Sequence, residues 1–184
     1  MHFHRFFDDD ERKKWQDPEL ILRSIGVKCS LTFVDIGCGD GFFALPAARL
    51  VGERGMVYAL DIDEEAIERL RKKAVRERLD NIILTVGEAE ETILCKHDAD
   101  VVFYGIVLHD FASPEKVLAN AKKMLKPDGQ LVDLDWKKEP MDLGPPLRTR
   151  FSEIYAANLI RQASFEIEIV KPSGLYHYMI VARP

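Results

Sequence analysis

The chain has 184 residues, of which 47% are hydrophobic and 31% charged, a composition that is ordinary for a globular protein with a full core. Its formal net charge of −5 argues against a general role in nucleic-acid binding, and we expect no membrane insertion because no apolar stretch is long enough for it. The three cysteines have no metal-ligand spacing and suggest no disulfide framework, so we expect a cytoplasmic protein without a metal site.

Residues 1–29 are expected to form an N-terminal cap or lid. A helix is predicted at 18–26, with Asp17 as its N-cap. Three interpretations of the rings before it remain open: they cover one edge of a sheet, close over a substrate, or pack on a second copy of the chain in a homodimer. These rings belong to His2, Phe3, His4, Phe6, Phe7 and Trp15.

Residues 30–136 alternate between short apolar runs and helical patterns, as expected for strands joined by helices. Because the runs are apolar throughout, the strands should be buried on both faces. This predicts a three-layer α/β sandwich around a doubly wound, mainly parallel, seven-stranded sheet of the Rossmann-like type. The strands are predicted at 31–36, 56–60, 82–86, 100–104 and 130–136, and the helices at 42–51, 64–79 and 113–125, with a short helix ending at Leu94 and a turn at 127–129.

Residues 137–184 are predicted to complete the same single domain, 1–184. A loop at 137–146 precedes a helix at 148–161, and strands at 165–170 and 176–182 form a closing hairpin. The last strand should therefore run antiparallel to its neighbour.

Basic residues gather on the helix predicted at 64–79. They either form a local patch for nucleic acid or lie on the solvent face of the helix, opposite its apolar residues. The second interpretation is favoured, because solvated charged faces are common. These residues are Arg69, Arg71, Lys72, Lys73, Arg76 and Arg78.

The first strand ends in a glycine turn, Gly37-Cys38-Gly39-Asp40-Gly41, and a helix follows. Glycine lets the backbone adopt a positive φ and lets a ligand approach the main chain, while a helix N-terminus offers free N–H groups. Asp61 ends the second strand about 20 residues later, at the spacing where an acid meets ribose hydroxyls in nucleotide-binding folds. Turn and acid together predict a nucleoside-containing cofactor.

The position of the third glycine distinguishes between cofactors. A dinucleotide site has the pattern G-x-G-x-x-G, but Phe42 stands at the place of its last glycine, and no Walker lysine follows the turn. A cofactor with ribose, adenine and a charged amino-acid tail therefore fits better than one bound through phosphates.

In this context, residues 34–41 resemble motif I of the class I S-adenosylmethionine-dependent methyltransferases. The chain is most similar to the small-molecule branch typified by ubiquinone and menaquinone biosynthesis methyltransferases. The resemblance covers about residues 30–136 and continues at 59–63, 87–90, 103–109 and 124–129.

This resemblance implies S-adenosylmethionine as the methyl donor and S-adenosylhomocysteine as the product. Asp61 would accept hydrogen bonds from both ribose hydroxyls. Capping of the following turn by Asp35, and space-filling by Cys38, are alternatives that need no ligand. Glu88 departs from the family, which usually has aspartate there. The implied cofactor-binding residues are Asp35 for the ammonium group, Gly37, Cys38, Gly39 and Gly41 in the turn, Asp61 at the ribose, Ile62, Glu88 and Ala89 around adenine, and Tyr104 and Gly105 at the sulfonium end.

Methyl transfer from a sulfonium is an in-line displacement, so the protein contributes mainly by positioning and by excluding water. His109, in the loop after the fourth strand, is the candidate base for an oxygen or nitrogen acceptor, and Tyr104 is the second candidate catalytic residue. A loop histidine hydrogen-bonded to Asp110 is the alternative for His109. Asp135 and Trp136 either line the acceptor pocket or simply end a strand.

The segment Tyr104-Gly105-Ile106-Val107 differs from the signature of enzymes that methylate amino groups in nucleic acids. A small-molecule acceptor is therefore the favoured partner, with RNA or protein as the alternative acceptor. Strand alternation favours a structural role for His177 and Tyr178. Two other functions remain open, an NAD-dependent oxidoreductase and a non-catalytic adenosyl-ligand-binding subunit.

Overall fold

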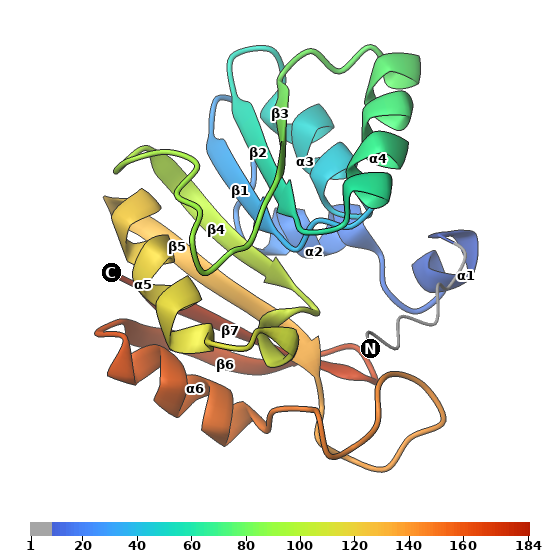
Figure 1. Cartoon of the computed structure of the whole chain (residues 1–184). Coiled ribbons are helices and arrows are strands. Elements are labelled where there is room, and N and C mark those ends of the chain that lie inside the picture. The colour runs from blue at the N-terminus through green and yellow to red at the C-terminus, as the bar shows by residue number, and fades with distance from the viewer. Residues whose placement is uncertain (1–8) are drawn as a thin grey trace.

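The structure, a computed structural model, describes residues 9–184, so the predicted roles of the rings at positions 2–7 lie outside the described residues. A seven-stranded sheet in the order β3-β2-β1-β4-β5-β7-β6 forms the middle layer, with helices on both faces (Figure 1). The strands are β1 (Thr32–Ile36), β2 (Met56–Asp61), β3 (Ile82–Val86), β4 (Ala99–Gly105), β5 (Leu125–Trp136), β6 (Glu166–Ser173) and β7 (His177–Arg183). The helices are α1 (Asp9–Lys13), α2 (Pro18–Ser24), α3 (Ala44–Val51), α4 (Glu64–Glu77), α5 (Pro114–Met124), α6 (Glu153–Gln162) and the 3-10 helix η1 (Leu108–Asp110).

The sheet is parallel from β3 through β2, β1 and β4 to β5, whereas β7 runs antiparallel to both β5 and β6. This confirms the predicted three-layer, mainly parallel fold with an antiparallel last strand. The strand order reverses between β1 and β4. The carboxyl ends of these two strands therefore border the crevice where open α/β sheets bind their ligands.

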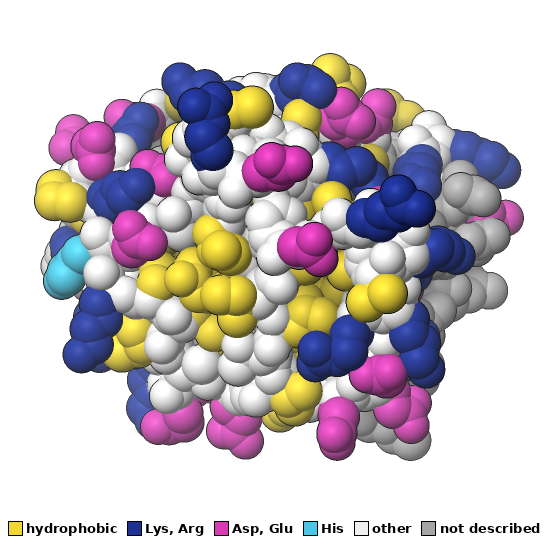
Figure 2. Space-filling view, turned by 90° about the horizontal axis from the view of Figure 1, so that it is seen from above, with side chains coloured by type: hydrophobic (Ala, Val, Ile, Leu, Met, Phe, Trp, Pro, Cys, Tyr) yellow, Lys and Arg dark blue, Asp and Glu magenta, His cyan; other side chains and the backbone are white. Residues whose placement is uncertain are grey.

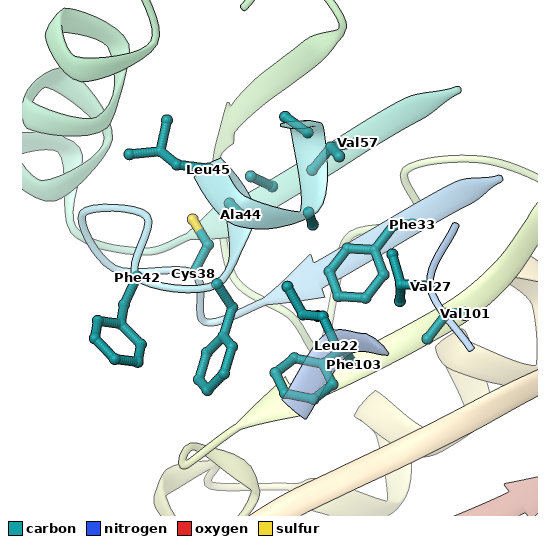
Figure 3. Close-up of a cluster of buried hydrophobic side chains, with 14 of the residues drawn as sticks. Leu22, Val27, Phe33, Cys38, Phe42, Ala44, Leu45, Val57, Val101 and Phe103 are labelled. Atoms are coloured by element: carbon teal, nitrogen blue, oxygen red, sulfur yellow. The ribbon is translucent and has the colours of Figure 1, made fainter. Parts of the chain in front are cut away.

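Two apolar cores separate the layers. The first lies between the sheet and α2, α3 and α4, and the second between the sheet and α5 and α6. In the first core, Phe33 of β1 and Phe103 of β4 are fully buried, with ring centroids 5.7 Å apart, near α3 (Figure 3). Cores on both sides of the sheet explain why its inner strands, such as β1, β4 and β7, are buried on both faces, whereas the edge strands β3 and β6 are partly exposed and depart from that expectation.

Side-chain caps define the starts of α2 and α4. The Asp17 carboxylate accepts a hydrogen bond from the Leu20 N–H at 3.0 Å. The Asp63 carboxylate accepts from the N–H groups of Glu65 and Ala66 at 2.9 and 3.2 Å. Both predicted N-caps are confirmed, and each satisfies N–H groups that have no partner within their helix.

Several cations of α4 lie beside carboxylates, most of them on the same helix. Arg71 and Lys72 both pair with Glu68, three and four residues away. Lys73 reaches across to Asp40 at 2.7 Å and so ties α4 to the glycine turn. These pairs fit the interpretation of the basic stretch as a solvated helix face.

The short helix predicted to end at Leu94 is wrong, because residues 87–98 form turns and an irregular loop. The side-chain amide of Asn120, in α5, donates to the carbonyls of Ala89 and Glu90 at 3.1 and 2.9 Å. These carbonyls are the acceptors that the first turn of a helix would have used. The loop is thus held by a contact from α5, which no local pattern predicts.

The loop leaves the β3 edge of the molecule partly uncovered. Ile83 and Val86 of β3 are 43% and 48% exposed, and Ile93 of the loop is 38% exposed. Figure 2, a view from the side of β3 and α4, shows apolar side chains gathered among charged ones. A helix at this position would have covered part of this surface.

The turn predicted at 127–129, before a strand starting at 130, is also wrong. These residues lie within β5, which starts at Leu125. The ladder between β4 and β5 jumps from the pair Ala99–Leu125 to the pair Val101–Gln130. A bulge in β5 therefore accommodates the Pro-Asp-Gly sequence within the strand.

The last helix begins later than the predicted 148–161, since α6 starts at Glu153 with Ser152 as its N-cap. Arg150 causes the difference. It is only 3% exposed, and its side chain bonds to the preceding loop instead of lying on a helix surface. The guanidinium donates to the carbonyls of Lys137, Glu139, Leu143 and Pro145 at 2.8 to 3.2 Å.

Candidate active site

The glycine turn after β1 is fixed by backbone hydrogen bonds to the end of β2. The N–H groups of Gly37 and Cys38 both donate to the carbonyl of Leu60, at 2.8 and 3.0 Å. Gly37 has a φ of +72°, and a Cβ added to it would lie 2.6 Å from a methyl group of Val107. Only glycine satisfies both conditions, so the turn lies against the loop after β4.

Asp61 braces the same turn from β2. One carboxylate oxygen accepts from the Gly39 N–H at 2.7 Å and the other from the Asp63 N–H at 2.9 Å. Each carboxylate oxygen can accept a second hydrogen bond, so the group still has acceptors for two hydroxyls. The next residue, Ile62, is 60% exposed and presents an apolar surface beside the carboxylate. This pair suits a ribose and an attached flat ring.

Asp35 is a buried acid, 1% exposed, whose Oδ2 has no hydrogen-bond partner. Burial and the nearby Asp61 raise the pKa of Asp35 to about 7, although Arg12 and a hydrogen bond from the Ala44 backbone oppose the shift. The contact with Ala44, at the start of α3, agrees with the capping alternative. The unpartnered oxygen fits a cationic ligand group as well, so the two roles are compatible.

The remaining residues predicted around the cofactor differ in exposure. Cys38 is buried, and burial together with Asp35 and Asp61 raises the pKa of its thiol, which suits a space-filling residue and not a nucleophile. Glu88 is exposed, whereas Ala89 is buried and held through its carbonyl by α5.

Packing accounts for the Tyr104 side chain and for the absence of a side chain at Gly105. Tyr104 is fully buried, and its hydroxyl donates to the carbonyl of Val117 at 3.2 Å, on the α5 side of the sheet. Burial raises the pKa of this phenol far above its usual value. A Cβ on Gly105 would lie 2.8 and 2.9 Å from the rings of Phe43 and Phe103. What these two residues offer a ligand is therefore their backbone.

His109 and Asp135 form a buried pair at the carboxyl ends of β4 and β5. The His109 Nδ1 lies 2.8 Å from the Asp135 carboxylate, and the Nε2 lies 3.4 Å from Asp110. Burial would lower the pKa of His109, but the attraction of Asp135, their hydrogen bond and Asp110 outweigh it and raise the pKa overall. Because a carboxylate only accepts, Nδ1 is a protonated nitrogen, and Nε2 faces Asp110, in agreement with the alternative of a loop histidine paired with that residue.

A cluster of rings near this pair was not predicted. Trp15, from the segment after α1, stacks on His177 of β7 with centroids 5.5 Å apart and an interplanar angle of 16°. Trp136, at the end of β5, lies 4.3 Å from the same imidazole ring. His177 is buried with an unpartnered Nε2, and burial and neighbouring cations lower its pKa to about 3. Strand alternation explains where His177 lies, but it carries no signal for the partner from the N-terminus.

Comparisons with known proteins decide the family. Residues 28–160 match a family model described as a methyltransferase domain. A crystal structure of a SAM-dependent methyltransferase from Aquifex aeolicus superimposes with a TM-score of 0.88 at 30% identity, covering 96% of this chain and 98% of the other. The chain belongs to the S-adenosylmethionine-dependent methyltransferases. This confirms the resemblance first indicated by the glycine turn, and S-adenosylmethionine is the methyl donor of the family.

Curated relatives of this methyltransferase are longer. It is 33% identical over 101 residues to a protein of Sulfurisphaera tokodaii named probable cobalt-precorrin-6B C(15)-methyltransferase (decarboxylating). The aligned residues cover 54% of this chain and 50% of the relative. It is 29% identical over 114 residues to a demethylmenaquinone methyltransferase of Halalkalibacterium halodurans, covering 62% and 46%. The chain thus spans about half the length of the curated relatives it matches.

Two further observations concern the described part of the methyltransferase. Among residues 9–184, none of the helices combines the length and hydrophobicity needed to cross a bilayer. In the same residues, His, Cys, Asp and Glu side chains nowhere gather in threes with an arrangement suited to a metal ion.

Proposed function

We propose that this protein transfers the methyl group of S-adenosylmethionine to a small-molecule acceptor. The observation that supports this best is the hydrogen bond between Gly39 and Asp61, which joins the turn to the acid while leaving acceptors for two ribose hydroxyls. The exposed Ile62 offers a surface for adenine, and the unpartnered oxygen of Asp35 offers a site for the ammonium group. The bound cofactor supplies an electrophilic methyl group on a positively charged sulfur.

The catalytic contribution of the protein is the orientation of the acceptor and the removal of its proton. We assign the base to His109, whose ring is held by Asp135 through Nδ1. The Nε2 would take the proton from an oxygen or nitrogen of the acceptor as that atom bonds to the methyl carbon, while the carbon–sulfur bond breaks and S-adenosylhomocysteine leaves. Asp135 keeps the resulting imidazolium stable without itself leaving the hydrogen bond. Tyr104 is left out of this assignment, because its hydroxyl is buried against Val117.

The class of acceptor follows from the surroundings of the base and from the relatives. The rings of Trp15 and Trp136 lie near the carboxyl end of β5, with centroids 5.8 Å apart, and favour an acceptor with a flat or apolar part. Precorrin and demethylmenaquinone, named in the relatives, are both small molecules. We therefore favour a small molecule over RNA or protein.

Two measurements test the proposal in sequence. Calorimetric titration with S-adenosylmethionine, S-adenosylhomocysteine and NADH should show binding of the first two and none of NADH. Incubation with S-adenosylmethionine carrying a labelled methyl group should then label a compound in a small-molecule extract. Transfer of label to tRNA or to protein, with none to the extract, would contradict the small-molecule acceptor. Tight binding of NADH alone would contradict the methyl transfer itself.

A further inference from the structure

His177, the first residue of β7, carries a buried polar atom without a partner. The residue is 1% exposed, and its Nε2 makes no hydrogen bond with any residue of the range 9–184. Buried polar groups are normally hydrogen-bonded, and an unsatisfied one costs free energy. A ligand group that forms a hydrogen bond with this Nε2 would remove that cost.

Aromatic rings enclose the imidazole of His177. The pairing of β5 with β7 places Trp136 directly opposite His177, and the two rings lie 4.3 Å apart. Trp15 stacks on the imidazole, and the Tyr176 ring stands edge-on to it at 6.4 Å. Rings of this kind bind flat or apolar groups through their faces. The unpartnered nitrogen is therefore a polar point within an aromatic surface.

Two cations beside these rings bind backbone carbonyls. Lys137 directly follows Trp136, and its Nζ donates to the carbonyls of Gly174 and Leu175 at 3.5 and 3.0 Å. The guanidinium carbon of Arg150 lies 5.6 Å from the Trp136 ring, and its N–H groups donate to four carbonyls of the preceding loop. Within residues 9–184, neither cation has a carboxylate at ion-pair distance. Both charges therefore contribute to a positive field around the rings.

The positive field determines what the Nε2 should bind. A neutral imidazole nitrogen is either a donor or an acceptor. Burial, together with the cations Arg12, Lys137 and Arg150, lowers the pKa of His177 to about 3, so the ring is neutral at neutral pH. The cations that disfavour a charged imidazole favour an anion beside it. Because an anion accepts hydrogen bonds, the Nε2 would act as the donor.

We propose that His177 binds a carboxylate of the methyl acceptor, through a hydrogen bond from its Nε2 and with the positive field of Lys137 and Arg150. The flat or apolar part of the same molecule lies against the rings of Trp15 and Trp136. The inference rests on the proposed function and narrows the class of its acceptor to small molecules that carry a carboxylate.

This subsite and the proposed base lie on opposite faces of the sheet. Asp135, which holds His109, pairs across the sheet with Tyr178, a residue of the second core. The next pair along these strands, Trp136 and His177, therefore points to the other face, because side chains alternate along a strand. The acceptor would extend past the carboxyl end of β5, with its reacting atom on one side and its carboxylate on the other.

The test uses benzoate and benzamide, which share a ring and differ in charge. Both tryptophans of the chain lie at the subsite, so their fluorescence reports binding there. Titrations are made on the full chain with S-adenosylhomocysteine in excess, which keeps the probes out of the cofactor site. The wild-type protein should bind benzoate about tenfold more tightly than benzamide. His177→Phe keeps a ring but removes the donor, so it should bind both probes with the affinity of benzamide.

Lys137→Met is a second variant, at a residue that is not buried, and should weaken benzoate alone by about threefold. Lys138→Met is its matched control, because Lys138 is the exposed cation next to it, and should change neither affinity. The melting temperature of each variant shows whether it is folded. Equal affinities for the two probes in the wild-type protein, or binding of neither, would overturn the carboxylate subsite. So would a preference for benzoate that persists in folded His177→Phe.

The proposed function is tested separately from the subsite. Calorimetric titration with S-adenosylmethionine should give the same dissociation constant for the wild-type protein and for Lys137→Met. A wild-type protein that binds S-adenosylmethionine but does not prefer benzoate would overturn the subsite and leave the proposed function intact. Absence of S-adenosylmethionine binding would overturn the proposed function, whichever probe the rings prefer.

Discussion

At the β1–β2 side of the crevice, backbone N–H groups of Gly37, Cys38 and Gly39 make the hydrogen bonds that shape the proposed cofactor site. At the β4–β5 side, the pair formed by His109 and Asp135 is made by side chains 26 residues apart. The first side depends on backbone geometry, and the positions of the glycines in the sequence indicate that geometry. The second depends on which loops the sheet brings together. Because one site is shaped by the backbone and the other by side chains, substitutions on the second side could change the acceptor while the methyl donor stays the same.

The largest expected effect is on the β4–β5 side. Replacement of His109 by Gln should lower kcat by about 10²- to 10⁴-fold, because general-base catalysis contributes that much, and should leave the affinity for S-adenosylmethionine unchanged. The exposed His97 lies at the opposite end of β4, so His97→Gln is the matched control. A His109→Gln protein with normal kcat would show that the acceptor loses its proton without a base.

A variant of Asp135 gives a second test of His109 as the base. Its carboxylate raises the pKa of His109 in the folded protein, so Asp135→Asn should lower that pKa and move the acid limb of the kcat–pH profile to lower pH. The rate rises with pH as the imidazole loses its proton, and the midpoint is the quantity to measure. An unchanged midpoint would assign the limb to another group.

On the cofactor side, Asp61→Asn should weaken S-adenosylmethionine binding roughly 100-fold, because it replaces an acceptor-only group by one that also donates. Asp40 lies in the same turn but pairs with Lys73, so Asp40→Asn serves as the control. Calorimetry at one pH is sufficient for this comparison. Equal losses in the two variants would mean that Asp61 acts through the turn and not on the ribose.

A smaller effect concerns the pH dependence of cofactor affinity. Because Asp35 has a pKa of about 7 in the free protein, it is protonated below that pH and must lose its proton to pair with an ammonium group. Affinity for S-adenosylmethionine should therefore rise by about tenfold per pH unit up to pH 7 and level off above it. Methylthioadenosine, which lacks the ammonium group, should bind with no such dependence. Titrations between pH 5.5 and about 8 distinguish these outcomes.

The smallest effect is expected for Tyr104→Phe. The variant loses one buried hydrogen bond to Val117, so the free energy of unfolding should fall by about 1 kcal/mol. Its kcat should stay within about twofold of the wild-type value, because the hydroxyl lies in the core. A loss of kcat by more than about 100-fold in a folded variant would return Tyr104 to the catalytic set.

The sequence alone predicts the fold and the methyl donor well, for a physical reason. Turn glycines, N-caps and the acid at a strand end determine the structure of residues close to them in the chain. A local sequence pattern is therefore enough to identify them. Contacts over long separations are not visible in this way. Two examples are the stacking of Trp15 on His177 and the hydrogen bond from Asn120 to the loop at 87–98. Both depend on which elements the sheet places side by side. The sequence indicates His109 and Asp135 as separate candidates, but it does not predict that they pair.

Arg150 has a consequence for engineering. Its guanidinium bonds to backbone carbonyls of Lys137, Glu139, Leu143 and Pro145, so the loop folds around a side chain of its own. Contacts outside the loop must be kept as well: the Trp136 ring lies 5.6 Å from the guanidinium carbon, and Lys137 donates to the carbonyl of Leu175 at 3.0 Å. Residues 137–150 are therefore a segment that could be replaced as a unit. Transplanting the loop of another methyltransferase, with its arginine retained, offers a route to new acceptors that leaves the methyl-donor machinery untouched.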